Sequence, residues 1–299
     1  MNRLNRIKGA LYGVAVGDAL GGTTEFMSAG AVKKTYGYLT EIIGGGVWEL
    51  EPGEVTDDTM MTLCVAEGIL EAPDDPMPAI GEKFLSWYRS DPKDIGNIIR
   101  KVLSTYKGNW MRAAFLADCD MGQSAGNGAL MRCLPVALAY PELSDVERVS
   151  RLQSKMTHYD ERCAETSILY NRIAHRIIED DADLKQTIAQ EISGTEYADL
   201  LNGLPDCDPT GFVVDTFRWV IHLLLTSASY EEVVQRAANE GGDSDTIAAI
   251  SGGLAGLYYG FDAIAERYRK QIIISDRLNY VSERLEKLRR DRVSFKQQK

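Results

Sequence analysis

Apolar residues recur at helical spacing along most of the chain. One apolar face runs from Ile7 to Ala15, and a second runs from Met60 to Leu70. Residues three and four positions apart share one face of a helix, so this spacing predicts amphipathic helices. Further stretches with the same spacing are 78–90, 95–106, 128–140, 145–156, 161–179, 213–226, 230–239, 245–259 and 276–290.

Strand signals are few, and turn residues divide the helical stretches. Thr35–Ile43 has some extended character, but Gly37 and the glycine run 44–46 favour a loop there. Turn residues also cluster at 73–78 and 202–211. No low-complexity linker divides the chain. We therefore expect an all-α fold, with a single compact multi-helix domain over residues 1–299.

Glycines repeat every four residues in two of these stretches. A glycine inside a helix costs about 1 kcal/mol relative to alanine, so the repeats call for a compensating role. Flat ridges of this kind let two helix backbones approach closely. We hypothesise that both helices lie at the centre of the bundle. The glycines are Gly9, Gly13, Gly17 and Gly21 in the first helix, and Gly252, Gly256 and Gly260 near the end of the chain.

The composition is that of an ordinary soluble globular protein, with 44% hydrophobic and 26% charged residues. The formal net charge of −11 argues against nucleic-acid binding, which needs cations facing phosphates. Residues 266–299 nevertheless carry 11 basic and 5 acidic side chains, which predicts a basic C-terminal helix at about 266–299. A solvated helix is the simplest interpretation, and a docking face for an acidic partner or an anionic membrane is the alternative.

The cysteines and the hydropathy bear on the expected compartment. The 5 cysteines show no C-x-x-C spacing, so they indicate neither a disulfide framework nor a zinc site. No apolar segment follows the basic N-terminal residues directly, so we expect no signal peptide. The most apolar window, 247–261, is shorter than the roughly 20 residues that span a bilayer. We expect a cytoplasmic monomer with reduced thiols, with peripheral membrane association as an alternative.

Two segments far apart in the chain combine paired carboxylates with threonines. Residues 56–59 read Thr-Asp-Asp-Thr, and residues 241–246 read Gly-Gly-Asp-Ser-Asp-Thr. Each precedes a helical stretch, so helix capping would explain either segment alone. Capping does not require adjacent carboxylates, however, and converging carboxylates repel one another unless cations lie between them. Hard oxygen donors suit magnesium, calcium or manganese, so we expect a two-metal site with Glu25 as a further oxygen donor.

Other polar positions are less specific. Asp94, at the start of a helical stretch, is explained by an N-cap, and His158 before a helix by a structural role. The Gly-Asn-Gly turn at 126–128 would let backbone N–H groups approach a phosphate or a ribose. Residues 44–48 form either a mobile flap carrying Trp48 or a plain loop. The chain has no P-loop, no dinucleotide-binding glycine fingerprint and no serine nucleophile elbow.

In chain order, these segments resemble the ADP-ribosylglycohydrolase family. The resemblance covers roughly residues 5–262, through segments 13–21, 25–27, 53–59, 94–97, 126–132, 157–158 and 241–246. It implies the all-α fold of that family and two Mg²⁺ or Mn²⁺ ions. The implied metal ligands are Thr56, Asp57, Asp58, Asp243, Asp245 and Thr246. The implied catalytic residues are Asp94 and Glu25, and the implied ADP-ribose pocket is lined by Asn97, Gly126, Asn127, Gly128 and His158.

The resemblance also implies an activity, namely hydrolysis of the N-glycosidic bond between ADP-ribose and an arginine side chain. The implied partner is an ADP-ribosylated protein, with dinitrogenase reductase as the first candidate, and a regulatory protein at the membrane is a further candidate. The pattern for that target has a second histidine where this chain has Tyr159-Asp160, and a tyrosine in place of Phe212. Other ADP-ribosyl substrates, a two-metal phosphoesterase and a non-catalytic structural or binding homologue stay open.

Overall fold

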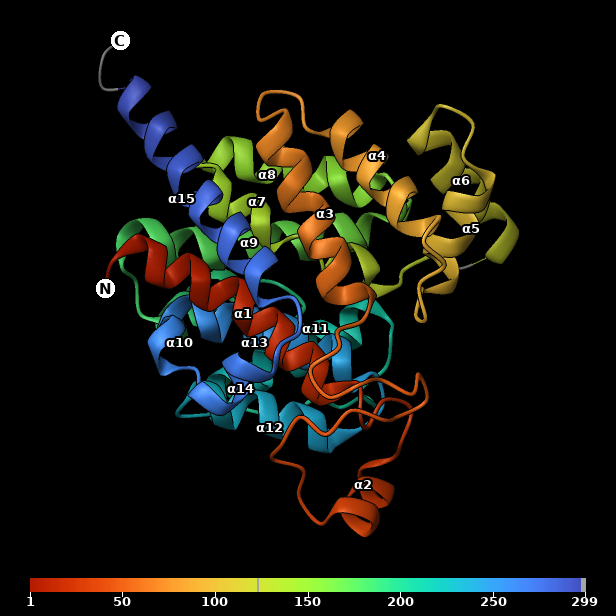
Figure 1. Cartoon of the computed structure of the whole chain (residues 1–299), viewed down its shortest axis with the longest axis vertical. Coiled ribbons are helices and arrows are strands. Elements are labelled where there is room, and N and C mark those ends of the chain that lie inside the picture. The colour runs from red at the N-terminus through yellow and green to blue at the C-terminus, as the bar shows by residue number, and fades with distance from the viewer. Residues whose placement is uncertain (123, 297–299) are drawn as a thin grey trace.

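The computed structural model describes residues 1–122 and 124–296, and helices account for the regular structure of this part of the chain (Figure 1). The first half forms α1 (Arg3–Gly21), α2 (Ala29–Tyr36), α3 (Asp57–Glu71), α4 (Met77–Tyr88), α5 (Asn97–Thr105), α6 (Trp110–Met121), the 3-10 turn η1 (Asn127–Ala129) and α7 (Leu134–Ala139). The second half forms α8 (Leu143–Lys155), α9 (Glu161–Asp180), α10 (Leu184–Ile192), η2 (Ala198–Leu201), α11 (Val213–Thr226), α12 (Tyr230–Glu240), α13 (Ser244–Tyr259), η3 (Phe261–Ala263), α14 (Glu266–Gln271) and α15 (Ser275–Lys296). Only isolated β-bridges occur in the described ranges, so the all-α prediction is confirmed.

Two predicted helices are interrupted in the structure. The stretch 128–140 is not one helix but η1 followed by α7, with Pro135 in the first turn of α7. A proline ring clashes with the carbonyl four residues earlier and lacks an N–H donor, so it cannot lie inside a continuous helix.

The prediction of one basic helix at about 266–299 is likewise wrong in its extent. The segment forms α14 and α15 with a break between them, and residues 297–299 lie outside the described residues. At the break Ile272 is 2% exposed whereas Ile273 is 56% exposed. The Ile273 N–H donates to the Gly53 carbonyl oxygen at 3.1 Å, which replaces a helical bond with a tertiary one.

The pair α1 and α13 lies at the centre of the molecule, packed antiparallel, with α3, α12 and α15 against it (Figure 1). The glycine ridges face each other. A Cβ atom added at Gly13 would lie 2.9 Å from the Gly252 carbonyl carbon and still closer to its oxygen. Side chains at these positions would force the helices apart, so the hypothesis of a close central pair is confirmed.

This packing brings the C-terminal end of α1 against the N-terminal end of α13. A Cβ added at Gly21 would lie 2.5 Å from the Asp245 Cα. The Ser244 hydroxyl donates to the Gly21 carbonyl oxygen at 2.9 Å, which fixes the register of the two ends. The glycine pair therefore places the second Asp/Thr segment beside the last turn of α1.

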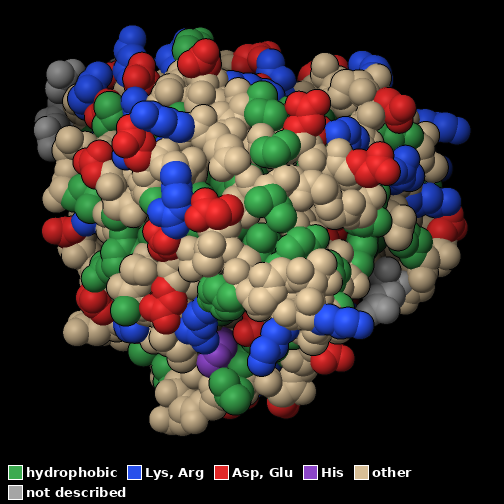
Figure 2. All heavy atoms as spheres, turned by 60° about the horizontal axis from the view of Figure 1, so that its bottom comes forward, with side chains coloured by type: hydrophobic (Ala, Val, Ile, Leu, Met, Phe, Trp, Pro, Cys, Tyr) green, Lys and Arg blue, Asp and Glu red, His purple; other side chains and the backbone are tan. Residues whose placement is uncertain are grey.

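The surface carries mixed charge. On the face drawn in Figure 2, acidic and basic side chains are interspersed, and apolar side chains lie between them. No helix in the described part of the chain combines the length and the apolar character that crossing a membrane requires.

Substitution of Gly13 tests the central contact. Gly13→Ala should lower the free energy of unfolding by at least about 2 kcal/mol, because the new methyl group meets backbone atoms that cannot rotate away. Urea denaturation would measure the loss. Gly30→Ala is the matched control, since the nearest atom to its added Cβ is the Ser28 Oγ at 4.0 Å. Equal stability of the two variants would contradict the close packing.

Candidate active site

The first Asp/Thr segment begins α3, and a residue of α1 holds it. The Asp18 carboxylate accepts hydrogen bonds from the Thr56 N–H at 3.0 Å and the Thr59 N–H at 3.1 Å. It also accepts from the Thr56 hydroxyl at 2.9 Å and the Thr59 hydroxyl at 2.5 Å. The Thr56 side chain accepts no capping bond itself. Asp18 thus caps α3 from another helix, which leaves Asp57 and Asp58 free of that task.

The second segment meets the first at the beginning of α13. The Thr246 hydroxyl donates to Asp58 Oδ2 at 3.1 Å, across 188 positions of sequence. The Asp243 side chain forms no capping bond to its helix and instead accepts a hydrogen bond from the Asn127 amide. Helix capping therefore does not explain the carboxylates of either segment, and the structure brings the two segments together.

Glu25 and Asp94 complete a cluster of carboxylates. One oxygen each from Glu25, Asp94 and Asp245 lie within 4.8 Å of one another. The Trp48 indole N–H donates to Glu25, so residues 44–48 form a loop that folds back over the cluster. Asp94 does not cap α5, which begins at Asn97 after Gly96. The N-cap interpretation of Asp94 is therefore wrong.

Burial raises the pKa of every carboxyl group in this cluster, and repulsion between neighbouring carboxylates adds to the effect for most of them. The pKa of Glu25 rises to about 8 and that of Asp94 to about 9. The pKa values of Asp58 and Asp245 lie well above their ordinary range for the same causes. The pKa values raised to about 6 are those of Asp18, Asp57 and Asp243.

Such a cluster fits divalent cations by its donor set. Asp58 Oδ1 is buried and has no hydrogen-bond partner in the described ranges, although the other oxygen accepts from Thr246. A buried carboxylate oxygen without a partner is costly, and a cation beside it would remove that cost. The convergent donors are carboxylate and hydroxyl oxygens, the set that magnesium and manganese prefer.

A cavity of about 420 Å³ opens beside the cluster, a volume in the usual range for small-molecule sites. Thr56 and Asp58 are not among the residues that line it. Its apolar walls include Phe26, Trp48 and Met131. The expected site residues that line the cavity are Glu25, Asp57, Asp94, Asn97, Gly126, Asn127, Gly128, His158, Asp243, Asp245 and Thr246.

The Gly-Asn-Gly turn is tied to the second Asp/Thr segment. The Asn127 backbone N–H donates to the Gly211 carbonyl oxygen at 3.0 Å, and the Asn127 side-chain amide donates to the Asp243 carboxylate. The Asp243 N–H donates to the Pro209 carbonyl oxygen at 2.9 Å. Hence the loop before α11 joins the turn to the beginning of α13.

No role for Asp18 was predicted from the sequence, and the role of Trp48 was left open. Asp18 is the one charged residue between Lys8 and Glu25, and it lies inside a glycine-rich apolar helix. A charge in such a place signals a buried polar partner. Trp48 carried no comparable signal, because its contact with Glu25 depends on how the intervening loop folds back.

The departures from the family pattern lie outside the 420 Å³ cavity. Asp160 caps α9 by accepting from the Arg162 N–H at 2.9 Å. The Tyr159 ring is exposed and meets Phe115 edge-on at 5.1 Å. Phe212 precedes α11, and the Arg162 guanidinium lies 5.1 Å from the centre of its ring. These three residues therefore do not alter the carboxylate cluster.

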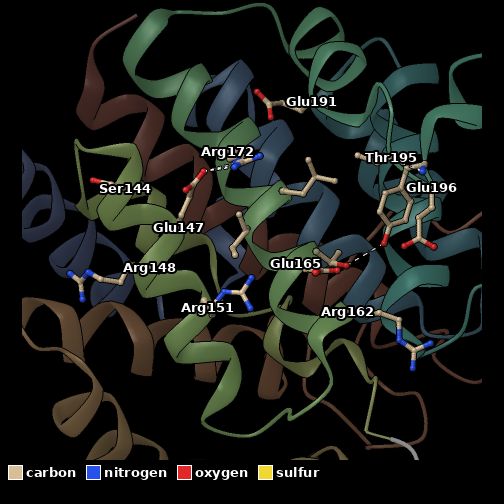
Figure 3. Close-up of a pocket in the computed structure, with 14 residues that line it drawn as sticks. Ser144, Glu147, Arg148, Arg151, Arg162, Glu165, Arg172, Glu191, Thr195 and Glu196 are labelled. Atoms are coloured by element: carbon tan, nitrogen blue, oxygen red, sulfur yellow. Dashed lines mark hydrogen bonds and ion pairs between the residues drawn. The ribbon is translucent and has the colours of Figure 1, made fainter.

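A larger cavity, of about 600 Å³, lies between α8, α9 and the segment after α10 (Figure 3). Arginines line it, but each is paired with a carboxylate. Arg172 and Glu147 point toward each other at 2.6 Å (Figure 3). Arg148 and Arg162 pair with aspartates at 2.9 and 2.7 Å, and Arg151 pairs with Glu161. Because these charges are mutually compensated, we place the chemistry in the smaller cavity.

The chain is similar to known proteins over nearly its whole length. The family model described as ADP-ribosylglycohydrolase matches residues 1–294. The chain is 34% identical over 270 residues to ADP-ribosyl-[dinitrogen reductase] glycohydrolase of Rhodospirillum rubrum, covering 87% of each protein. It is 28% identical over 299 residues to ADP-ribosylarginine hydrolase Tri1 of Serratia proteamaculans, covering 94% of this chain and 79% of that protein. A solved structure described as an ADP-ribosylglycohydrolase-related protein complex matches with a TM-score of 0.80 and 29% identity, covering 96% of this chain and 98% of that one.

The role of Asp18 can be tested through stability. Asp18→Asn should lower the free energy of unfolding by on the order of 1–3 kcal/mol, because the new amide group cannot accept all four hydrogen bonds. Urea denaturation in metal-free buffer measures this effect apart from any ion. Asp74→Asn is the control, since the Asp74 side chain is 91% exposed. A loss no larger than that of the control would show that Asp18 does not hold α3.

Proposed function

Since the chain belongs to the ADP-ribosylglycohydrolase family, we propose that it hydrolyses the N-glycosidic bond between ADP-ribose and an arginine side chain of a protein. The observation that carries the proposal is the convergence of the two Asp/Thr segments with Glu25 and Asp94 beside a cavity of about 420 Å³. The name of one relative, ADP-ribosylarginine hydrolase, supports the arginine linkage. Dinitrogenase reductase is the target we propose first, because the relative with 34% identity is named for it.

The carboxylate cluster would hold two Mg²⁺ or Mn²⁺ ions. Bound ions of this kind polarise sugar oxygens and supply an activated water. The Thr56 hydroxyl is prepared for this role because its proton points to Asp18, which leaves its lone pairs free. The residues that we propose as ligands are Thr56, Asp57, Asp58, Asp243, Asp245 and Thr246.

Asp94 is the carboxyl group that we propose for proton transfer. It lines the cavity and is not among the six proposed ligands. In the ion-free protein, burial and the neighbouring Asp57 and Glu25 carboxylates favour its protonated form. A guanidine leaves poorly unless it is protonated, and a carboxylic acid at this place can protonate the guanidine nitrogen or the ribose ring oxygen. Glu25, held by the Trp48 N–H, would orient the reacting ribose beside the ions.

The substrate class can be tested directly with the purified protein. We expect release of ADP-ribose from an ADP-ribosyl-arginine peptide in the presence of Mg²⁺ or Mn²⁺, and no release after chelation. An ADP-ribosyl-serine peptide and a simple phosphomonoester serve as competing substrates under the same conditions. Preference for the serine linkage would replace the arginine assignment, and turnover of the phosphoester alone would reject a glycohydrolase.

Two substitutions separate metal binding from proton transfer. Asp243→Ala should lose both bound metal and activity, because it removes a proposed ligand. Asp94→Asn should keep its metal and lose about 100-fold or more in kcat, the usual contribution of a general acid. Metal content after dialysis and kcat are the two measurements.

Asp91→Asn is the control for the loop, since Asp91 is exposed with φ of 54° and asparagine tolerates that conformation. Unchanged metal content in Asp243→Ala would count against the proposed ligand set. Full turnover in Asp94→Asn would remove Asp94 from its role.

A further inference from the structure

A buried chain of hydrogen bonds lies behind the Gly-Asn-Gly turn of the cavity. Arg132 Nη2 donates to the Thr157 hydroxyl oxygen at 2.7 Å. The same oxygen lies 2.8 Å from Nδ1 of His158. Arg132 and Thr157 are 0% exposed and His158 is 1% exposed, so bulk water does not compete for these groups.

The chemistry of Arg132 determines which group donates and which accepts in each of these hydrogen bonds. A guanidinium can only donate, so the Thr157 oxygen must accept from Arg132. The Thr157 proton then has one acceptor among the described residues, which is His158 Nδ1. If Nδ1 were the donor instead, a buried hydroxyl proton would lack an acceptor, a loss of about 1–3 kcal/mol. Nδ1 of His158 is therefore the acceptor and carries no proton.

The single ring N–H of His158 is therefore at Nε2. Burial, together with the nearby Arg132 charge, lowers the pKa of His158 to about 3, so the imidazole is neutral. In the described part of the chain no hydrogen bond is made by Nε2, and His158 lines the cavity. A Cβ atom added at Gly126 or Gly128 would lie 3.5 or 3.4 Å from Nε2. Because both positions are glycines, no Cβ atom of the turn packs against this edge of the ring.

Hydrogen bonds and a ring contact hold the Arg132 guanidinium in one position. Its Nε donates to the Gln153 side-chain oxygen at 3.0 Å, and Nη2 donates to the Gln153 carbonyl oxygen at 3.0 Å. The guanidinium lies 4.5 Å from the centre of the Phe84 ring. The Gln153 amide donates to the Ala129 carbonyl oxygen at 3.0 Å, which ties the arrangement to the turn.

We propose that Arg132 and Thr157 are positioning residues that fix His158 as the neutral tautomer with its proton on Nε2, so that this N–H donates to an oxygen acceptor of the bound ligand. The identity of the ligand, an ADP-ribosyl group, rests on the proposed function, whereas the tautomer does not. A neutral donor of this kind binds the ligand and takes no proton from it. His158 and Asp94 therefore have different tasks in the cavity.

The tautomer can be measured in the unmodified protein. The chain has only 3 histidines, so ¹⁵N-histidine labelling gives a simple spectrum, and His158→Gln identifies the His158 signals by their loss. At neutral pH we expect Nε2 to bear the proton and Nδ1 to show the shift of an unprotonated nitrogen. A proton on Nδ1, or an imidazolium, would overturn the proposal whatever the enzyme's substrate.

Variants of Thr157 test the hydrogen-bond chain from Arg132 to His158. Thr157→Val keeps the shape but removes the hydroxyl, so the His158 signals should indicate mixed tautomers and the Kd for ADP-ribose should rise about five- to tenfold. Thr157→Ser restores the hydroxyl and should restore both the single tautomer and the affinity. A single Nε2–H tautomer with unchanged Kd in Thr157→Val would show that Thr157 does not position His158.

A second pair keeps the test open if Thr157→Val does not fold, as judged by circular dichroism. The amide N–H of Gln can replace Nε2–H, so His158→Gln should bind ADP-ribose more tightly than His158→Leu by about tenfold. Equal affinities would overturn the donor role. Failure of the unmodified protein to bind ADP-ribose would instead reject the proposed ligand and leave the tautomer result valid.

Discussion

The close approach of α1 and α13 is the contact on which the rest of the structure depends. Backbone meets backbone along this pair because the facing positions are glycines, as at Gly13 and Gly252. The contact has a chemical consequence at one end, where the last turn of α1 lies against Ser244 and Asp245. A wider separation of these helices would move the second Asp/Thr segment away from Asp18. The glycines are therefore part of the geometry of the site.

Asp18 connects the central helix pair to the beginning of α3. It lies on α1, within the central pair, and its four hydrogen bonds hold both Thr56 and Thr59 at the beginning of α3. Three helices thus end or begin at one place: α1 brings Asp18, α3 brings Asp57 and Asp58, and α13 brings Asp245. Because Asp18 satisfies the N-terminal donors of α3, the acidic residues there keep oxygens free, as Asp58 Oδ1 shows.

The sequence was sufficient for the local features and insufficient for those that depend on distant contacts. Helical spacing predicted most of the bundle, the two Asp/Thr segments predicted the carboxylate cluster, and the resemblance to the family predicted most of the cavity lining, since each signal is written in consecutive residues. The helices α2, α6 and α10 were not predicted. The break at 272–274 was also missed, because it depends on a hydrogen bond from Ile273 to Gly53, 220 positions away. Asp18 could be noticed as an isolated charge, but its partners, 38 and 41 positions away, could not be read from spacing.

Buried polar groups are satisfied in different ways on the two sides of the cavity. On one side, Asp58 and Asp245 are buried together with raised pKa values and an oxygen without a partner, a state that protons or cations relieve. On the other side, each buried donor from Arg132 to His158 has an acceptor until the chain reaches the cavity. One wall therefore needs positive charge from outside the chain, whereas the other presents a neutral donor that is fixed in advance. With cations at the first wall, a ligand with sugar hydroxyls and anionic oxygens would suit both walls, because its hydroxyls can bind the cations and its oxygens can accept from the N–H.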